Sequence, residues 1–390
     1  MSWPLVKLGE LVKVKGGKRL PKGSGYSESK TAYPYIRVTD FKNNSVRNSG
    51  LVYIEKEIQK KIARYTISCD DVYISIAGTI GIVGIIPEQL DGANLTENAA
   101  KLVINNKGQL DKNYLVRFLS TAGQAQIHER KKTTSQPKLA LFRIEEVEIP
   151  LPPLDEQKRI AAILDKADAI RRKRQQAIQL ADDFLRSVFL DMFGDPVTNP
   201  KGWEVKKFSD LGNWASGGTP SRSVSGYFEG EINWFSAREL NHRYLNESVE
   251  KITDEALSKS AAKIFPAGSM LVGMYDTAAF KISILNVASA SNQACANIIP
   301  NEKIDIEWFF SFIEFSKETY LRQRRGVRQQ NLNLGMIKDF DLPLPPKTEQ
   351  EKFVKLAHKT MQMKERNYSS LSNSLDNFNS LSQKAFAGEL

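Results

Sequence analysis

Residues 136–157 read Q-P-K-L-A-L-F-R-I-E-E-V-E-I-P-L-P-P-L-D-E-Q, and residues 329–350 read Q-Q-N-L-N-L-G-M-I-K-D-F-D-L-P-L-P-P-K-T-E-Q. The two stretches begin 193 residues apart (329 − 136), close to half of the 390-residue chain. They share the spacing of their apolar residues and a Pro-x-Pro-Pro pattern. The sequence W-P-L-V-K-L-G-E-L at 3–11 likewise matches W-E-V-K-K-F-S-D-L at 203–211. Such self-similarity indicates a duplication, so we expect two similar domains in a pseudo-two-fold arrangement.

The composition is that of a globular protein with a basic excess. Apolar residues make up 41% of the chain and charged residues 26%, and the length suits two domains that each bury a core. The 55 Lys and Arg exceed the 45 Asp and Glu by ten, which favours an anionic partner, nucleic acid first. Cys69 and Cys295 stand alone, which predicts buried thiols in a reducing compartment. No apolar run is long enough to span a membrane, so we expect a cytoplasmic protein.

Each half opens with strand-like segments and continues with a helix. Runs of β-branched and aromatic residues bounded by turn residues predict strands at 33–40, 71–77, 232–237 and 269–275. Apolar residues at helical intervals predict helices at 114–127 and 308–322. A basic segment and a short strand ending in proline then follow in both halves. The predicted fold class is α+β, with two tandem similar mixed α/β domains.

A long helix is predicted after each proline-rich stretch. Seams with a mean spacing of 3.5 residues are typical of coiled-coil helices. A helix of roughly 38 residues reaches about 57 Å, farther than a small domain is wide. We therefore expect the two helices to form an antiparallel coiled coil, and not each to cover only its own domain. The expected interface residues are Ile160, Ile163, Ile170, Val188, Leu371, Leu375 and Phe378.

The same patterns give the domain boundaries and the helix starts. The first domain is expected at 1–153, the central helix at 154–193, the second domain at 194–346 and the C-terminal helix at 347–390. Thr348 with Glu351 three residues later is typical of a capping box, and Asp155 is the expected N-cap of the central helix.

Sequence signatures of catalysis are missing. The chain has no Gly-x-x-x-x-Gly-Lys-[Ser/Thr] phosphate loop, no Gly-x-Gly-x-x-Gly fingerprint and no Asn-Pro-Pro-Tyr motif of the amino-methyltransferases. His128, His242 and His358 are scattered, which gives no support to a histidine metal site or a Ser/His pair. We therefore expect a chain that is not an enzyme and that holds no cofactor and no metal.

Two kinds of segment are candidates for contact with DNA. Basic segments at 128–138 and 321–331 occupy equivalent places in the two halves, and loops at 15–22 and 216–222 begin with a Gly pair that allows close backbone approach. Cations neutralise phosphates, whereas guanidinium and amide groups pair with base edges. Solvated helix ends and plain surface loops are the alternatives. The candidate DNA-binding residues are Lys18, Arg19, Lys22, Arg37, Lys131, Lys132, Gln136, Lys138, Thr219, Arg222, Arg238, Arg324, Arg325, Arg328 and Gln329.

The chain resembles the specificity (S) subunits of type I restriction–modification systems. The resemblance rests on I-P-L-P-P-L-D-E-Q at 149–157 and L-P-L-P-P-K-T-E-Q at 342–350, with support from F-G-D-P at 193–196 and A-F-A-G-E-L at 385–390. It covers the whole chain, and the repeated motif at this offset is specific.

The resemblance implies a function and partners. Each half would be a target recognition domain that reads one part of a bipartite sequence in double-stranded DNA. The long helices would hold the two domains apart. Two methyltransferase (M) subunits would dock on this scaffold and supply the S-adenosylmethionine chemistry, and restriction/translocase (R) subunits would join for cleavage. Two other classes remain open, a single-chain enzyme that modifies or cleaves DNA and a protein-binding coiled-coil adaptor.

Overall fold

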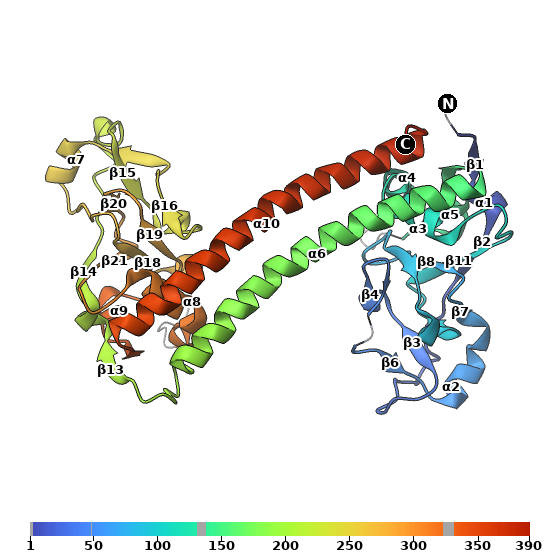
Figure 1. The fold of residues 1–390 in the computed structure, drawn as a ribbon, viewed down its shortest axis with the longest axis horizontal. Helices are drawn as coiled ribbons and strands as arrows, with labels where there is room; N and C mark the ends of the chain where they lie inside the picture. The colour runs from blue at the N-terminus through green and yellow to red at the C-terminus, as the bar shows by residue number, and fades with distance from the viewer. Residues whose placement is uncertain (1–2, 48, 131–137, 323–330) are drawn as a thin grey trace. The chain divides into compact units, whose positions relative to one another are not determined.

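The computed structural model describes residues 3–47, 49–130, 138–322 and 331–390 (Figure 1). The chain forms two compact units. Unit 1 contains Met1–Gln175 and Tyr368–Leu390, and unit 2 contains Gln176–Asn367. Two long helices, α6 (Leu154–Phe193, green in Figure 1) and α10 (Lys347–Ala387, red), each pass from one unit into the other.

Unit 1 is built on two four-stranded sheets. The first has the order β2-β11-β8-β9 and is antiparallel throughout, and the second has the order β6-β3-β10-β7 with β3 and β10 parallel. The strands are β1 (Leu5–Lys7), β2 (Val12–Gly16), β3 (Pro34–Ile36), β4 (Phe41–Lys42), β5 (Ser45–Val46), β6 (Val52–Tyr53), β7 (Thr66–Ile67), β8 (Val72–Ser75), β9 (Val83–Ile85), β10 (Ala93–Leu95), β11 (Ala99–Ile104) and β12 (Glu148–Pro150). The α-helices before α6 are α1 (Leu8–Leu11), α2 (Lys56–Lys61), α3 (Lys112–Ser120), α4 (Gly123–Glu129) and α5 (Leu141–Glu145).

Unit 2 has a five-stranded and a three-stranded sheet. Their orders are β14-β21-β18-β19-β16 and β17-β15-β20. The strands are β13 (Glu204–Lys207), β14 (Gly212–Ser216), β15 (Ile232–Phe235), β16 (Tyr244–Leu245), β17 (Glu250–Ile252), β18 (Met270–Gly273), β19 (Ile282–Leu285), β20 (Ala290–Ser291), β21 (Cys295–Pro300) and β22 (Asp341–Leu344). The α-helices between α6 and α10 are α7 (Asp254–Ser258), α8 (Ile306–Leu321) and α9 (Leu334–Lys338).

The two units repeat one topology. Strands β2, β11, β8 and β9 of unit 1 correspond in order and direction to β14, β21, β18 and β19 of unit 2. The parallel pair β3–β10 corresponds to β15–β20. The first strand of each unit pairs antiparallel with the proline-bearing strand, with Leu5 opposite Pro150 and Val205 opposite Pro343. The predicted α+β class with two tandem similar domains is confirmed.

In each unit one helix joins the sheet to the long helices. Helix α3 contributes Leu115 to a core that also contains Leu164 of α6 and Ala385 of α10. Helix α8 contributes Trp308 to the equivalent core of unit 2, which includes Phe353 of α10. The ring of Trp308 is fully buried, and no described residue offers its Nε1 a hydrogen bond. The sheets of each unit are therefore joined to the long helices by continuous apolar packing.

The glutamine of each repeated Glu-Gln pair is fully buried and fixes the start of a long helix. Gln157 Oε1 accepts a hydrogen bond from Asp111 N at 2.9 Å, and its Nε2 donates to Gln109 O and Pro152 O, both at 2.9 Å. Asp111 is also the N-cap of α3. The Gln157 amide therefore connects backbone groups of the segment before α3 with a carbonyl of the segment before α6, and gives each of the three a hydrogen-bond partner.

Unit 2 contains the same arrangement at equivalent positions. Gln350 accepts from the backbone N–H of Asp305 at 2.7 Å and donates to Lys303 O at 3.1 Å and Pro345 O at 2.9 Å. Asp305 is the N-cap of α8. Recurrence of all three hydrogen bonds explains why glutamine follows the proline-rich stretch in both halves.

Both units show that α6 and α10 run antiparallel where they meet. In unit 1, Arg174 donates to Ser370 Oγ, and the Arg159 Nη2 donates to Leu390 O at 2.9 Å. In unit 2, Lys364 pairs with Asp182, and the Phe189 and Phe353 rings lie 5.4 Å apart. Increasing numbers on one helix thus meet decreasing numbers on the other, as predicted.

The residues of the expected helix interface differ in burial. Ile170 is 43% exposed and Leu375 is 39% exposed, whereas Ile178 is buried. Ile160 is fully buried, and Ile163, Val188, Leu371 and Phe378 are half-buried. A straight α-helix drifts by about 20° per heptad from a 3.5-residue repeat. The buried face therefore moves away from residues chosen at a constant 3.5-residue spacing as the helix lengthens.

The predicted caps also shift by one or two residues. Helix α6 begins at Leu154 and α10 at Lys347, so Asp155 and Thr348 lie inside the first turn. The backbone N–H groups of Glu156 and Gln157 both donate to Pro153 O. The prolines hold the chain extended up to the helix, and the buried glutamine supplies the fixation expected from a cap.

Candidate nucleic-acid interface

A glycine pair lies against the strand connection that follows the parallel strand in each unit. A Cβ on Gly17 would meet Thr96 O at 2.1 Å, and a Cβ on Gly217 would meet Asn292 O at 2.3 Å. The Gly17 N–H donates to Ala99 O at 2.9 Å, and the Gly217 N–H donates to Cys295 O at 3.1 Å. The close approach expected of these glycines is therefore to the protein's own backbone. The close approach places the β2–β3 loop against the β10–β11 connection, and the β14–β15 loop against the β20–β21 connection.

In unit 1 this contact forms a cavity of about 540 Å³. Arg19 and Arg37 both line it, together with Tyr35 and Glu97. The Arg19 Nε donates to Glu97 Oε1 at 2.7 Å. The Tyr35 hydroxyl donates to Lys18 O at 2.8 Å, and burial raises the pKa of Tyr35 to about 12. Two candidate residues that are 18 positions apart in the sequence thus share one site.

Asp40 holds Arg37 in a fixed orientation. The Arg37 Nε donates to Asp40 Oδ2 at 3.0 Å, its Nη2 donates to Asp40 Oδ1 at 2.9 Å, and Nη2 also donates to Gly50 O at 3.1 Å. Burial alone would raise the pKa of Asp40, but hydrogen bonds from Arg37 and Arg47 outweigh it and lower that pKa. Arg37 is therefore already engaged on one whole edge of its guanidinium.

Unit 2 forms a cavity of about 460 Å³ at the equivalent place. Arg222 and Arg238 line it, with Trp234 on β15 and Asn292 from the β20–β21 connection. Arg222 pairs with Glu250, and this pairing lowers the pKa of the Glu250 carboxyl. Arg238 is exposed, and the described part of the chain offers its guanidinium no hydrogen-bond or ion-pair partner.

The other candidates fall into three groups. Thr219 Oγ1 donates to Gln293 beside the unit 2 cavity, and the Lys18 Nζ lies 5.6 Å from the centre of the Tyr65 ring. Lys22 and Lys138 are exposed, but neither lines the unit 1 cavity. The remaining candidates lie outside the described residues: Lys131, Lys132, Gln136, Arg324, Arg325, Arg328 and Gln329.

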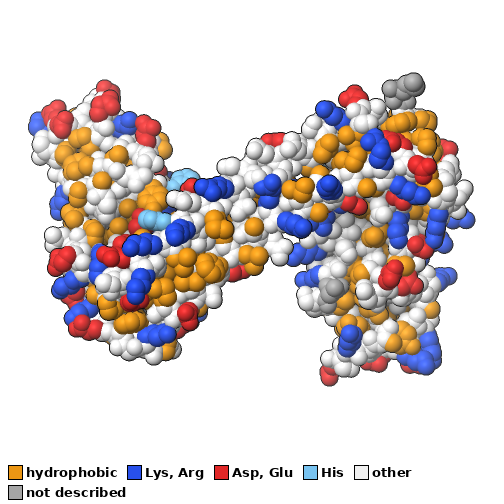
Figure 2. Space-filling model, viewed as in Figure 1, with side chains coloured by type: hydrophobic (Ala, Val, Ile, Leu, Met, Phe, Trp, Pro, Cys, Tyr) orange, Lys and Arg blue, Asp and Glu red, His pale blue; other side chains and the backbone are white. Residues whose placement is uncertain are grey.

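Sequence reasoning missed the carboxylates that orient these arginines. Asp40, Glu97 and Glu250 each pair with an arginine of the candidate set. Only Asp40 carried a local signal, since it follows Arg37 by three residues, whereas the other partners are distant in sequence. On the face that Figure 2 shows, Lys and Arg side chains are interspersed with Asp and Glu.

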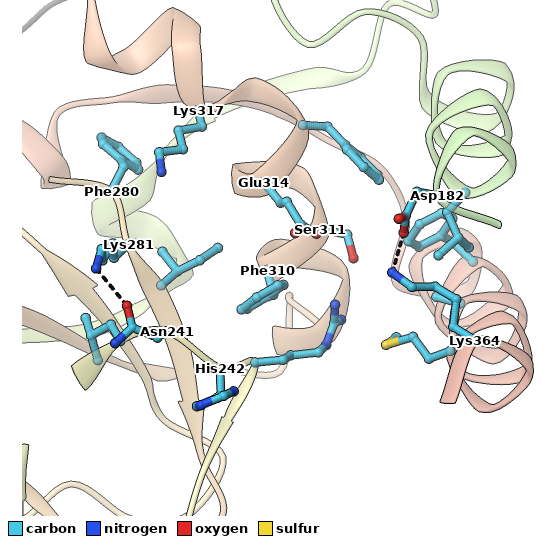
Figure 3. A pocket seen from close by; sticks show the side chains of 18 residues that line it. Asp182, Asn241, His242, Phe280, Lys281, Phe310, Ser311, Glu314, Lys317 and Lys364 are labelled. Atoms are coloured by element: carbon cyan, nitrogen blue, oxygen red, sulfur yellow. Dashed lines mark hydrogen bonds and ion pairs between the residues drawn. The ribbon is translucent and has the colours of Figure 1, made fainter. Parts of the chain in front are cut away.

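Unit 2 contains a further cavity of about 380 Å³ between α8, α6 and α10 (Figure 3). Phe310, Phe315 and Met361 form its apolar lining, and Lys317 and Glu314 extend into it. The Glu314 side chain keeps solvent contact, yet the surrounding protein desolvates it and raises the pKa of its carboxyl. The aromatic lining and the acidic group distinguish this cavity from the two arginine-bearing ones.

At the equivalent place in unit 1, a cluster of ion-paired side chains takes the position of the cavity. Arg117, six residues after the N-cap of α3, donates to Asp168 Oδ2 at 2.9 Å, and Asp168 also pairs with Arg171 and Arg172. Burial opposes ionisation of Asp168, but the three arginines outweigh it and lower the pKa of Asp168 to about 2. Ser311 and Met361 stand at the matching positions of unit 2 and leave the cavity open.

Within the described ranges, no group of three or more His, Cys, Asp or Glu side chains could hold a metal ion. A search of the same residues found no helix with the length and apolarity needed to cross a bilayer. Cys295 is buried, and Cys69 is half-buried.

The family described as "Type I restriction modification DNA specificity domain" matches residues 2–180 and 200–365. The chain therefore belongs to this family. The MjaIX specificity subunit of Methanocaldococcus jannaschii is 29% identical over 158 residues, which cover 39% of this chain and only 36% of that protein. The MjaVIII specificity subunit of the same organism is 24% identical over 385 residues, 90% of this chain and 84% of that protein. The crystal structure of the type I S subunit from M. genitalium has a similar fold, with 15% identity, a TM-score of 0.60 and coverage of 99% of this chain and 96% of that one.

Proposed function

We propose that this chain is the sequence-specific DNA-recognition subunit of a type I restriction–modification complex. Each unit reads one part of a bipartite target in double-stranded DNA. The observation that carries this proposal is the repetition of one arginine-lined cavity, formed by equivalent loops of two topologically equivalent units. Arginine suits this role because its planar guanidinium pairs with phosphates and with base edges. A role on cellular DNA also fits the cytoplasmic location expected from the sequence.

The proposed DNA contacts comprise two sets. The first set comprises the cavity residues Arg19, Arg37, Arg222 and Arg238, with Thr219 beside the unit 2 cavity. Flanking cations and amides come second, namely Lys18, Lys22, Lys131, Lys132, Gln136, Lys138, Arg324, Arg325, Arg328 and Gln329. We assign the second set mainly to phosphates, which position a protein on DNA without specifying sequence.

The catalytic subunits are the other proposed partners. Two methyltransferase subunits dock on the helix pair and restriction/translocase subunits join them, whereas this chain performs no chemistry and needs no cofactor. The long helices carry exposed apolar side chains that a docked subunit would cover. They include Ile170 and Leu375 in unit 1 and Leu180, Phe184 and Met363 in unit 2.

Methylation mapping tests this function. The chain is co-expressed with its methyltransferase partner in a host without the system, and modified adenines are mapped by sequencing. We expect one split recognition sequence, and replacing residues 1–153 with the matching domain of another S subunit should change only one half of it. Methyl transfer by the isolated chain would favour a single-chain enzyme. A partner complex that methylates no defined sequence would favour a protein-binding adaptor.

A further inference from the structure

Arg222 is held more rigidly than the other described candidate arginines of unit 2. Its Nη1 lies 2.5 Å from Glu250 Oε1, and its Nη2 lies 2.7 Å from Glu250 Oε2. The guanidinium carbon lies 4.2 Å from the centre of the Phe228 ring and 5.6 Å from that of Trp234. Glu250 fixes the direction of the guanidinium, and the two rings limit its tilt. An exposed ion pair adds little to stability, so this geometry has more value for orienting a donor group.

Among the residues that the structure describes, the contacts to Glu250 leave a pair of Arg222 donors free. A guanidinium has five N–H donors, and Glu250 takes one from each terminal nitrogen. The Nε–H and the adjacent terminal N–H remain side by side on one edge, in the spacing that matches two neighbouring acceptors. The Arg222 side chain is 57% exposed, so a ligand can reach this edge.

Guanine is the base that presents such an acceptor pair in the major groove. Its N7 and O6 accept two hydrogen bonds from one arginine, and the other three bases do not offer two acceptors there. A phosphate also accepts two hydrogen bonds from an arginine fork, but it binds a mobile cation as well, so it gives no reason for the orientation that Glu250 and the two rings impose on Arg222. We propose that Arg222 reads a guanine in the half-site bound by unit 2, with Glu250 and Phe228 as positioning residues. This inference rests on the proposed function and adds the base that unit 2 requires.

Unit 1 provides an internal comparison. The Arg37 Nε donates to Asp40, and its Nη2 donates to both Asp40 and Gly50. Among the described residues this leaves Nη1 without a partner, so neither edge of the guanidinium keeps two adjacent free donors. Arg19 makes one ion-pair contact, through Nε to Glu97, and its side chain is 79% exposed. The two cavities thus differ in what they offer to a base, although equivalent loops form them.

The test measures binding by the complex with its methyltransferase partner to a set of duplexes, in which each base pair of the second half-site is changed in turn. The wild-type complex should require G at one position, and Arg222→Gln should lose roughly 5- to 150-fold of discrimination there. The same variant should bind duplexes already changed at that position about as well as wild type does. Methylation maps of cells should then show that position relaxed and the first half-site unaltered.

Two variants separate positioning from folding. Glu250→Gln should reduce discrimination at the same position more than it reduces overall affinity, because the fork is no longer fixed. Arg238→Gln, the matched control in the same cavity, should weaken all duplexes alike. If Arg222→Gln weakens every duplex equally while its melting curve is unchanged, Arg222 is a phosphate contact and the inference fails. A second half-site without a guanine requirement overturns it too, and in both cases a mapped split site leaves the proposed function standing.

Discussion

Replacing Gln157 with leucine should loosen the junction between α3 and α6. The side chain is fully buried and makes three hydrogen bonds, of which the one to Pro152 O lies between buried groups. Gln157→Leu leaves one N–H and two carbonyl groups without these partners. A buried polar group that loses its partner costs ~1–3 kcal/mol. Water can reach the two part-buried groups, so we expect a loss of about 3 kcal/mol rather than the full sum.

The assay is thermal unfolding of the full chain, combined with hydrogen exchange. For a domain of this size each kcal/mol lowers the melting temperature by ~2–4 °C, so the unit 1 transition should fall by roughly 6–12 °C. The amide of Asp111 should lose protection first, because its acceptor is removed. Gln350→Leu should have the same effect on the unit 2 transition and on the amide of Asp305.

Exposed glutamines on the same helices serve as controls. Gln175→Leu on α6 and Gln362→Leu on α10 change the same chemistry at exposed positions. Both should leave the melting temperatures within about 2 °C of wild type, since surface substitutions mostly stay within ±0.5 kcal/mol. If Gln157→Leu shifts the transition no more than Gln175→Leu, the buried amide is not what fixes the start of α6.

Three shorter predictions concern acid stability, DNA contact and loop packing. The pKa of Asp168 falls from an ordinary 3.8 to about 2 in the folded chain, so its stabilising effect should be complete above about pH 5 and be lost as the pH falls through about 2. Asp168→Asn should remove this part of the acid dependence, measured by denaturation from about pH 6 to about pH 2. Arg238→Ala should lower the slope of log affinity against log salt concentration by about one unit, and an unchanged slope would mean that Arg238 touches no phosphate. Gly17→Ala should destabilise unit 1, because its Cβ would meet Thr96 O at 2.1 Å, whereas Gly25→Ala, which meets nothing within 4 Å, should melt like wild type.

The duplication and the element types could be read from the sequence because they rest on repeated local patterns. The apolar rhythm before Pro150 and Pro343 marked the paired strands, and the long seams marked α6 and α10. The exact seam could not be read this way. Asp168 is polar yet 2% exposed, because Arg117 from another element neutralises it. Arg171 and Arg172 on the same helix also pair with Asp168, but a pattern of apolar residues cannot show that Arg117, 51 residues away, completes the buried cluster.

The candidate site was only partly predictable for a similar reason. The glycine pairs and arginines of the two loops are visible in the sequence, and the structure brings Arg19 together with Arg37, and Arg222 together with Arg238. Which arginine keeps donors free depends on distant carboxylates. Glu97 is 78 residues from Arg19, and Glu250 is 28 residues from Arg222. The fold of each unit brings these arginines and carboxylates together, and their spacing in the sequence does not predict the ion pairs.

The two halves of the chain make the same contacts at the starts of the long helices, and different contacts at the arginines of the two cavities. Gln157 and Gln350 make the same three backbone contacts, so the position of each recognition domain on its helices follows one rule in both units. The arginines beside the glycine pairs follow no such rule, since Arg222 pairs end-on with Glu250 through both terminal nitrogens and Arg19 pairs with Glu97 through Nε alone. This division suits the proposed function, in which two similarly placed domains read different parts of a bipartite target. Substitutions at the buried glutamines should therefore alter stability without altering the sequence read, whereas substitutions at Arg222 or Glu250 should alter the sequence read with little effect on stability.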